Sequence, residues 1–305
     1  MHDDFADIRG VLEGIQSSPF FLGSQTFLHN VQFHNINSYT EVLVEKPPGG
    51  RKSLRPAKVE LVGRIDEFDF RLVPCGGWRP GWKRRFEETK AIGIILPPIW
   101  SELSFLWREV SNNLSRLPTL DFPRADVARG NSILTPGGGV KLRHTLFVPP
   151  NSVGRSSFLS RYNVGGGALT PGPEESDTSS TSTASEHAFR GALSSPFNPD
   201  EWVDGCLNIG AKLAMRDVFA EQLVRPNQLP AYDQSHVLLR PHQYHKMLPG
   251  ALVYAIVTIS CQYLNIQGTV NVYADIDCIR ILRPKPTVSF ENTVSTSDAI
   301  IKGRI

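Results

Sequence analysis

Two runs rich in Val, Ile, Ala and Tyr lie close together in the C-terminal part of the chain, between His236 and Leu282. The first follows the Pro249–Gly250 turn, and the second extends from Thr269 to Leu282. A short polar segment that contains glycine separates them, and this pattern is typical of a β-hairpin. Because each run is longer than an ordinary strand, we expect strongly coiled strands that wrap around a small barrel.

The predicted hairpin also fixes which residues face each other across its two strands. With the turn centred on the polar segment, Cys261 faces Val272 and Cys278 faces Ala255. We therefore expect no disulfide between these strands. The chain has four cysteines and no Cys-x-x-Cys pair, which favours reduced, partly buried thiols in an intracellular protein.

Shorter patterns predict further strands and two helices. The predicted strands are Thr26–His34, Tyr39–Lys46, Ala57–Val73, Ala91–Leu96 and Lys141–Val148. Gly63 interrupts the third of them, and we expect a bend or a bulge there. The predicted helices are Ser101–Leu117 and Trp202–Val224, the second of which ends before Pro226. The Gly137–Gly139 run precedes a strand and not a helix, so it predicts a hairpin tip and not a phosphate-binding loop.

Composition agrees with short strands and shows where the chain divides. Among 305 residues there are 23 prolines and 25 glycines, and such frequent breakers disfavour long helices. Residues 151–199 contain few large apolar side chains and many Ser, Thr, Gly and Pro, which is typical of a disordered insertion. We expect residues 1–150 to form the N-terminal β-rich part of one barrel, and residues 200–305 to add a helix and the closing hairpin. Two separate domains divided at the insertion are the alternative.

Aromatic and basic side chains alternate within residues 76–90, GGWRPGWKRRFEETK. The aromatic residues Trp78, Trp82 and Phe86 recur every four positions, and the basic residues between them are Arg79, Lys83, Arg84 and Arg85. Aromatic rings stack on unpaired bases and basic groups neutralise phosphates, so this combination predicts a groove for single-stranded nucleic acid. Since the whole chain carries a net charge of only +2, binding would depend on this local cluster. The competing interpretation is a short helix that packs its rings on the core and leaves its basic side in water.

Other candidate sites have fewer supporting residues. His242 and His245 would share one face of a helical turn, but no Cys, Asp or Glu at a recognised spacing completes a metal site. Asp275 and Asp277 would share a strand face, a spacing that suits acid–base or metal chemistry, although a solvent-facing position is the simpler interpretation. No nucleotide-binding, serine-hydrolase or metalloprotease motif occurs. We therefore expect no enzyme activity, no cofactor and no metal.

The C-terminal block resembles the OB-fold single-stranded-DNA-binding proteins of phages. In that family a turn with Pro or Gly launches a long strand, a second strand follows a Gly-containing loop, and a short apolar sequence closes the barrel. The corresponding segments here are Leu248–Gly250, Val253–Tyr263, Gly268–Tyr273 and Ile279–Leu282. The resemblance implies an OB-like barrel that binds DNA without catalysis. The DNA-contacting residues of the family have no individual counterparts here, and the basic end IIKGRI replaces its acidic tail.

The sequence therefore predicts a mainly β fold, an OB-like β-barrel with a few short helices and a long disordered insertion. The predicted function is non-catalytic binding of single-stranded nucleic acid, with DNA favoured and a homo-oligomer left open. The alternative is a structural or interaction protein with a β-barrel or jelly-roll fold, such as a capsid-like or scaffold subunit. An acidic N-terminus without an apolar run and the lack of a membrane-spanning stretch favour an intracellular protein, with the nucleus as one option.

Overall fold

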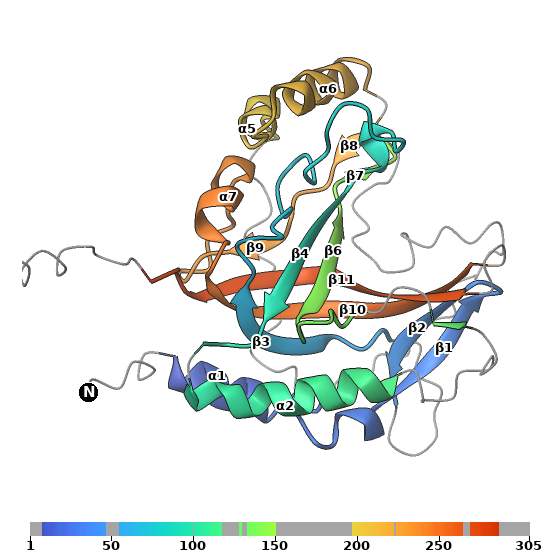
Figure 1. The fold of residues 1–305 in the computed structure, drawn as a ribbon, viewed down its shortest axis with the longest axis vertical. Coiled ribbons are helices and arrows are strands. Elements are labelled where there is room, and N and C mark those ends of the chain that lie inside the picture. Colours follow the sequence, from blue (N-terminus) through green and yellow to red (C-terminus); the bar gives the residue numbers. More distant parts are fainter. Residues whose placement is uncertain are drawn as a thin grey trace, which may run out of the picture.

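The fold is mostly β, as predicted, and is built around one large mixed sheet (Figure 1). The structure is a computed structural model and describes residues 8–46, 55–99, 101–117, 128–129, 133–150, 197–222, 224–264 and 269–286. The strands are β1 (Val31–Asn37), β2 (Thr40–Glu45), β3 (Val59–Ile65), β4 (Lys90–Leu96), β5 (Ala128–Arg129), β6 (Val140–Thr145), β7 (Phe147–Val148), β8 (Arg225–Pro226), β9 (Ala231–Tyr232), β10 (Leu252–Leu264) and β11 (Thr269–Arg283).

Short helices lie on both sides of the sheet (Figure 1). The α-helices are α1 (Arg9–Gln16), α2 (Ser101–Arg116), α5 (Pro199–Asp204), α6 (Ile209–Ala220) and α7 (Tyr244–Met247). Single 3-10 turns form η1 (Phe27–His29), η3 (Phe86–Glu88) and η5 (Pro241–Gln243). Helices α1 and α2 lie on one side of the sheet, and α5, α6 and α7 lie on the other.

Strand pairing closes part of the sheet into a ring of hydrogen bonds. Strand β10 pairs with β11 and β3, strand β4 joins β3 to β6, and β6 pairs with β11. All of these contacts are antiparallel except β6–β11, which is parallel. The β1–β2 hairpin extends the sheet by pairing with the distal half of β10, and β5 and β9 pair with β11. Strands on both sides of residues 151–199 therefore share one ring, while residues 151–196 lie outside the described part of the chain.

The predicted register of the β10–β11 hairpin is correct over its distal half. Cys261 faces Val272, but one extra residue in β11 shifts the register between Ile256 and Val257, so Cys278 faces Ile256 and not Ala255. This bulge strengthens the local twist that closing a ring requires. The described cysteines, Cys75, Cys206, Cys261 and Cys278, are all free, as predicted, and they are buried and not only partly buried.

One apolar core fills the ring, and a second lies between its outer surface and the N-terminal helix. Alternate residues of β10, from Val253 to Ile259, point into the main core. The outer residues Leu252 and Tyr254 instead pack with Leu12 and Ile15 of α1. Helix α2 has the predicted apolar face: Leu103 and Leu106 join the second core, and Trp107, Val110 and Leu114 join the main one.

Three predicted elements need correction. The Thr26–His34 segment begins with the turn η1, so its strand starts at Val31, and the Ala57–Val73 strand ends at Ile65. The Trp202–Val224 helix is interrupted at Gly205, where the backbone lies against Pro74 and Pro241, and the chain forms α5 and α6 instead. The Gly137–Gly139 run does form a hairpin tip, since Thr135 donates to the Gly139 carbonyl at 2.7 Å.

Gly63 is neither a bend nor a bulge, because β3 and β10 pair around it without a register shift. A Cβ at this position would lie 2.4 Å from Ile95 and 2.7 Å from the Trp107 ring. The glycine is therefore required for close packing of strand and helix, which is the other common reason for glycine inside a strand.

The substitution Gly63→Ala is expected to lower the free energy of unfolding by about 2–3 kcal/mol, because an added methyl group overpacks this contact. Gly14→Ala in α1 is the control: no atom lies within 4 Å of its Cβ position, so we expect a gain of about 0.5–1 kcal/mol. Urea denaturation measures both. Equal stability of Gly63→Ala and the unaltered protein would contradict the assigned packing.

Candidate functional site

The predicted site lies in the loop of residues 66–89 that connects β3 to β4. The loop is not a helix between residues 76 and 85: Gly76, Gly77 and Gly81 all have positive φ, at 56°, 72° and 86°. Only the turn η3 follows before β4 begins. The four-residue spacing of the aromatic side chains therefore does not place them on one helical face, and each has a different environment.

Two of the three predicted stacking residues anchor the loop to the core. Phe86 is 5% exposed, and Trp78 packs edge-on against it with ring centroids 5.3 Å apart. The Trp78 indole N–H donates to the Arg84 carbonyl at 3.1 Å, which closes the loop on itself. The prediction that Phe86 stacks on bases is therefore wrong, because its side chain is buried in the main core. Trp78 is partly buried and serves mainly as an anchor.

The tip of the loop presents one aromatic ring and three cations to water. Trp82 is 42% exposed. Arg79, Lys83 and Arg84 are exposed and have no acidic partner among the residues that the structure describes. Arg85 differs, because it forms ion pairs with Glu87 at 3.3 Å and Glu88 at 3.0 Å. The hydrogen bond to Glu88 raises the pKa of Arg85, so its charge is satisfied within the loop.

Helices α5 and α6 contact the 66–89 loop. The backbone of Gly210 in α6 is so close to Pro80 that a Cβ there would lie 2.4 Å from the proline ring. The ring of Phe86 lies 5.4 Å from that of Phe147, which in turn lies 6.3 Å from Trp202 in α5. The row of rings formed by Phe86, Phe147 and Trp202 thus packs the base of the loop on the core, while the tip is exposed to water.

Arg143, a residue that the sequence did not single out, forms a buried ion pair. Its guanidinium binds Asp275 through two hydrogen bonds of 2.7 and 2.9 Å, and it lies 3.5 Å from the centre of the Tyr273 ring. The two residues meet across the parallel β6–β11 contact. An alternating polar position in the predicted Lys141–Val148 strand was the only signal, because pairing between distant strands cannot be read from spacing.

The paired-carboxylate hypothesis for Asp275 and Asp277 is wrong. Asp275 is bound to Arg143, whereas the carboxylate of Asp277 lies 3.0 Å from Lys58 and accepts a hydrogen bond from Thr258. Asp277 is the extra residue of the bulge in β11, and the two carboxylates have different partners.

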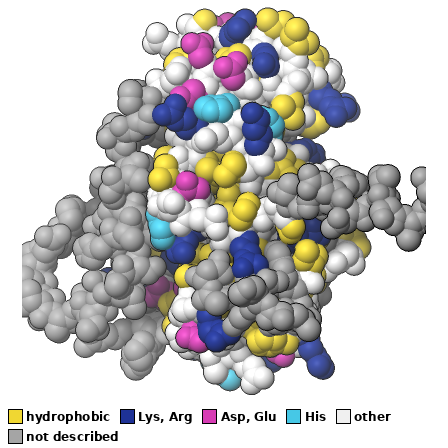
Figure 2. Space-filling view, turned by 90° about the vertical axis from the view of Figure 1, so that its left-hand side faces the viewer, with side chains coloured by type: hydrophobic (Ala, Val, Ile, Leu, Met, Phe, Trp, Pro, Cys, Tyr) yellow, Lys and Arg dark blue, Asp and Glu magenta, His cyan; other side chains and the backbone are white. Residues whose placement is uncertain are grey.

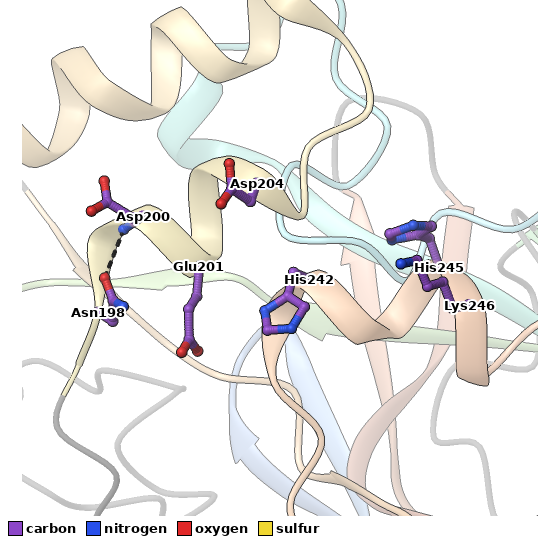
Figure 3. A pocket seen from close by; sticks show the side chains of 7 residues that line it. All are labelled: Asn198, Asp200, Glu201, Asp204, His242, His245 and Lys246. Atoms are coloured by element: carbon purple, nitrogen blue, oxygen red, sulfur yellow. Dashed lines mark hydrogen bonds between the residues drawn. The ribbon is translucent and has the colours of Figure 1, made fainter.

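A shallow hollow of about 390 Å³ lies between α5 and the η5–α7 segment (Figure 3). His242 and His245 line one wall, Asp200, Glu201 and Asp204 line the other, and histidine, acidic and basic side chains mix on this face (Figure 2). Burial lowers the pKa of His245, and the nearby Lys246 and His242 lower it further. Glu201 is bound by Arg240 at 3.0 Å. Among the described residues no group of three or more His, Cys, Asp or Glu side chains is placed to hold a metal ion.

The substitution Phe86→Ala is expected to lower the free energy of unfolding by about 3–5 kcal/mol, because it leaves a cavity in the core. Trp82→Ala should change it by less than about 0.5 kcal/mol, as expected for an exposed loop residue. Chemical denaturation followed by circular dichroism compares the two. Equal losses would mean that the Trp82 ring is part of the core after all.

Comparisons with protein-family models, with curated proteins and with solved structures find no match to this chain. Within the described residues no helix is both long and apolar enough to span a membrane. Function must therefore be inferred from strand order and from the side chains of the 66–89 loop.

Proposed function

We propose that this protein binds single-stranded nucleic acid through the 66–89 loop and the adjoining outer surface of β4 and β6, without catalysis. We further propose that the closed ring is an OB-like barrel. One observation supports both proposals: the loop with the aromatic and basic residues connects the first two strands of the ring, β3 and β4.

The ring has five strands, which along the chain are β3 (first), β4 (second), β6 (third), β10 (fourth) and β11 (fifth). Around the ring they follow the order β3-β4-β6-β11-β10, which is 1-2-3-5-4 in chain order. The third and fifth strands form the one parallel contact of this ring. The OB fold is a five-stranded Greek-key barrel that binds oligonucleotides with its second and third strands and with the loop between its first two strands. The 66–89 loop occupies that loop position, and β4 and β6 occupy the positions of the binding strands.

The side chains at this surface suit a flexible, charged strand. Trp82 offers a ring for stacking, and stacking requires a base that is not enclosed in a duplex. Arg79, Lys83 and Arg84 are close to it in the sequence, are exposed, and have no acidic partner in the described part of the chain. Lys141 adds an exposed cation on the outer side of β6. DNA is the strand we favour, on the resemblance to the phage proteins.

The stacking role of Trp82 is tested by fluorescence anisotropy with a labelled single-stranded oligonucleotide. Trp82→Ala should weaken binding by about 1–3 kcal/mol, the usual contribution of one stacked base. Phe68→Ala is a matched control, because Phe68 belongs to the same loop and is 98% exposed but is flanked by acidic residues. Equal affinities for Trp82→Ala and the unaltered protein would exclude stacking on this ring.

The electrostatic role is tested by the salt dependence of the same binding. Neutralisation of three phosphates by Arg79, Lys83 and Arg84 predicts a log–log slope of about −2. Arg84→Gln should make the slope less negative by about 0.7. Arg85→Gln should leave it unchanged, because Glu87 and Glu88 already neutralise Arg85. Binding that does not respond to salt, or no binding at all, would overturn the proposed function.

A further inference from the structure

Two buried thiols connect the 66–89 loop to the segment between α5 and α6. Cys75 lies at the base of the loop and is 3% exposed, and Cys206 follows α5 and is 1% exposed. The side chains of Cys75 and Cys206 interact with each other, while the Cys206 thiol donates to the Trp202 carbonyl oxygen at 3.5 Å. The neighbouring backbones are also in contact, because Gly205 lies against the ring of Pro74. The two sulfur atoms are therefore neighbours in space although 130 residues separate them along the chain.

The surroundings of Cys75 stabilise a negative charge on its sulfur. The backbone N–H groups of Gly77 and Leu207 donate to it, one from each of the two segments. The interaction with the Cys206 side chain, with the help of these donors, lowers the pKa of Cys75 to about 7 against the opposing effect of burial. The same interaction raises the pKa of Cys206. Cys75 is thus the nucleophile of the pair, and Cys206 is the thiol placed to attack it in a second step.

The other two cysteines offer a contrast within the same molecule. Burial raises the pKa of both Cys261 and Cys278, so they remain protonated at neutral pH. They lie on paired strands but face Val272 and Ile256, and not each other. Neither has a second thiol as its cross-strand partner.

We propose that Cys75 and Cys206 are a redox-modification site, in which a low-molecular-weight disulfide such as glutathione disulfide oxidises them to a disulfide that ties the 66–89 loop to the α5–α6 connection. In the first step the Cys75 thiolate attacks the small disulfide, forms a mixed disulfide and releases one small thiolate. In the second step Cys206 attacks the Cys75 sulfur, transfers its proton to the released thiolate, and expels the second small thiolate. The second small thiolate takes up from water the proton that Cys75 lost on ionisation, so that one small disulfide is reduced to two small thiols and two protein thiols become one disulfide.

Access to Cys75 depends on local opening of the loop, since its side chain is buried. The loop tip from Arg79 to Arg85 is exposed, and its contacts are with the loop itself and with Gly210 of α6, none of them in a ring strand, so such opening does not require the ring to unfold. Once formed, the disulfide joins a segment before β4 to one after β6 and restrains the base of the loop that carries Trp82.

The experiment uses the reduced full chain, incubated with glutathione disulfide at about one pH unit above the pKa of Cys75, where the thiolate dominates. After denaturation and alkylation, mass spectrometry should show two alkylated cysteines in place of four, with no glutathione attached. Peptide mapping should link the peptide of Cys75 to that of Cys206. Four alkylated cysteines, or a link that includes Cys261 or Cys278, would overturn the proposal without requiring any variant to fold.

Variants separate the two steps. Cys206→Ser should stop at the mixed disulfide, so that Cys75 retains one glutathione, and Cys75→Ser should acquire none. The double variant Cys261→Ser, Cys278→Ser is the matched control and should oxidise as the unaltered protein does. Equal glutathione attachment to all four cysteines would show only general thiol reactivity and would contradict the assigned pair. These readouts involve no nucleic acid, so they stand apart from the test of the proposed function.

Discussion

Backbone hydrogen bonding between β10 and β11 is the constraint on which the rest of the structure depends. These two strands pair with each other along their length, β10 also pairs with β2 and β3, and β11 also pairs with β5, β6 and β9. A register slip of one residue would turn the inward face of one strand outward. Val257 and Ile259 would then leave the core, and Thr258 would enter it. The buried apolar face of the hairpin therefore fixes the register of the whole ring.

The site follows from how the ring holds the 66–89 loop. Both ends of the loop enter ring strands, and Phe86 and Trp78 pack its base on the core. Because these two rings are used for anchoring, the tip can expose Trp82 and its neighbouring cations without a loss of order at the base. One aromatic residue is thus available to a ligand where the sequence pattern suggested three.

The sequence predicted those features that local physics decides. The β10–β11 hairpin, its distal register and the apolar face of α2 follow from periodicity and turn residues. Spacing could not reveal the bulge at Asp277 or the reason for Gly63, which is a contact with a helix more than forty residues later. In the site, the residue types were predictable, but which rings are buried was not. Glycine backbone conformations at positions 76, 77 and 81 remove the periodicity that would have indicated it.

The parallel contact between β6 and β11 has a consequence for how the protein can vary. Strand β11 lies between β6 and β10 in the ring. The chain that leaves β6 must therefore cross over the position of β11 before it enters β10, and this requires a long connection. The entropy cost of closing a connection rises only slowly with its length. Helices α5, α6 and α7 all belong to this crossover. Evolution or an engineer could therefore lengthen it, or insert a foreign domain into it, while the ring keeps every one of its backbone pairings.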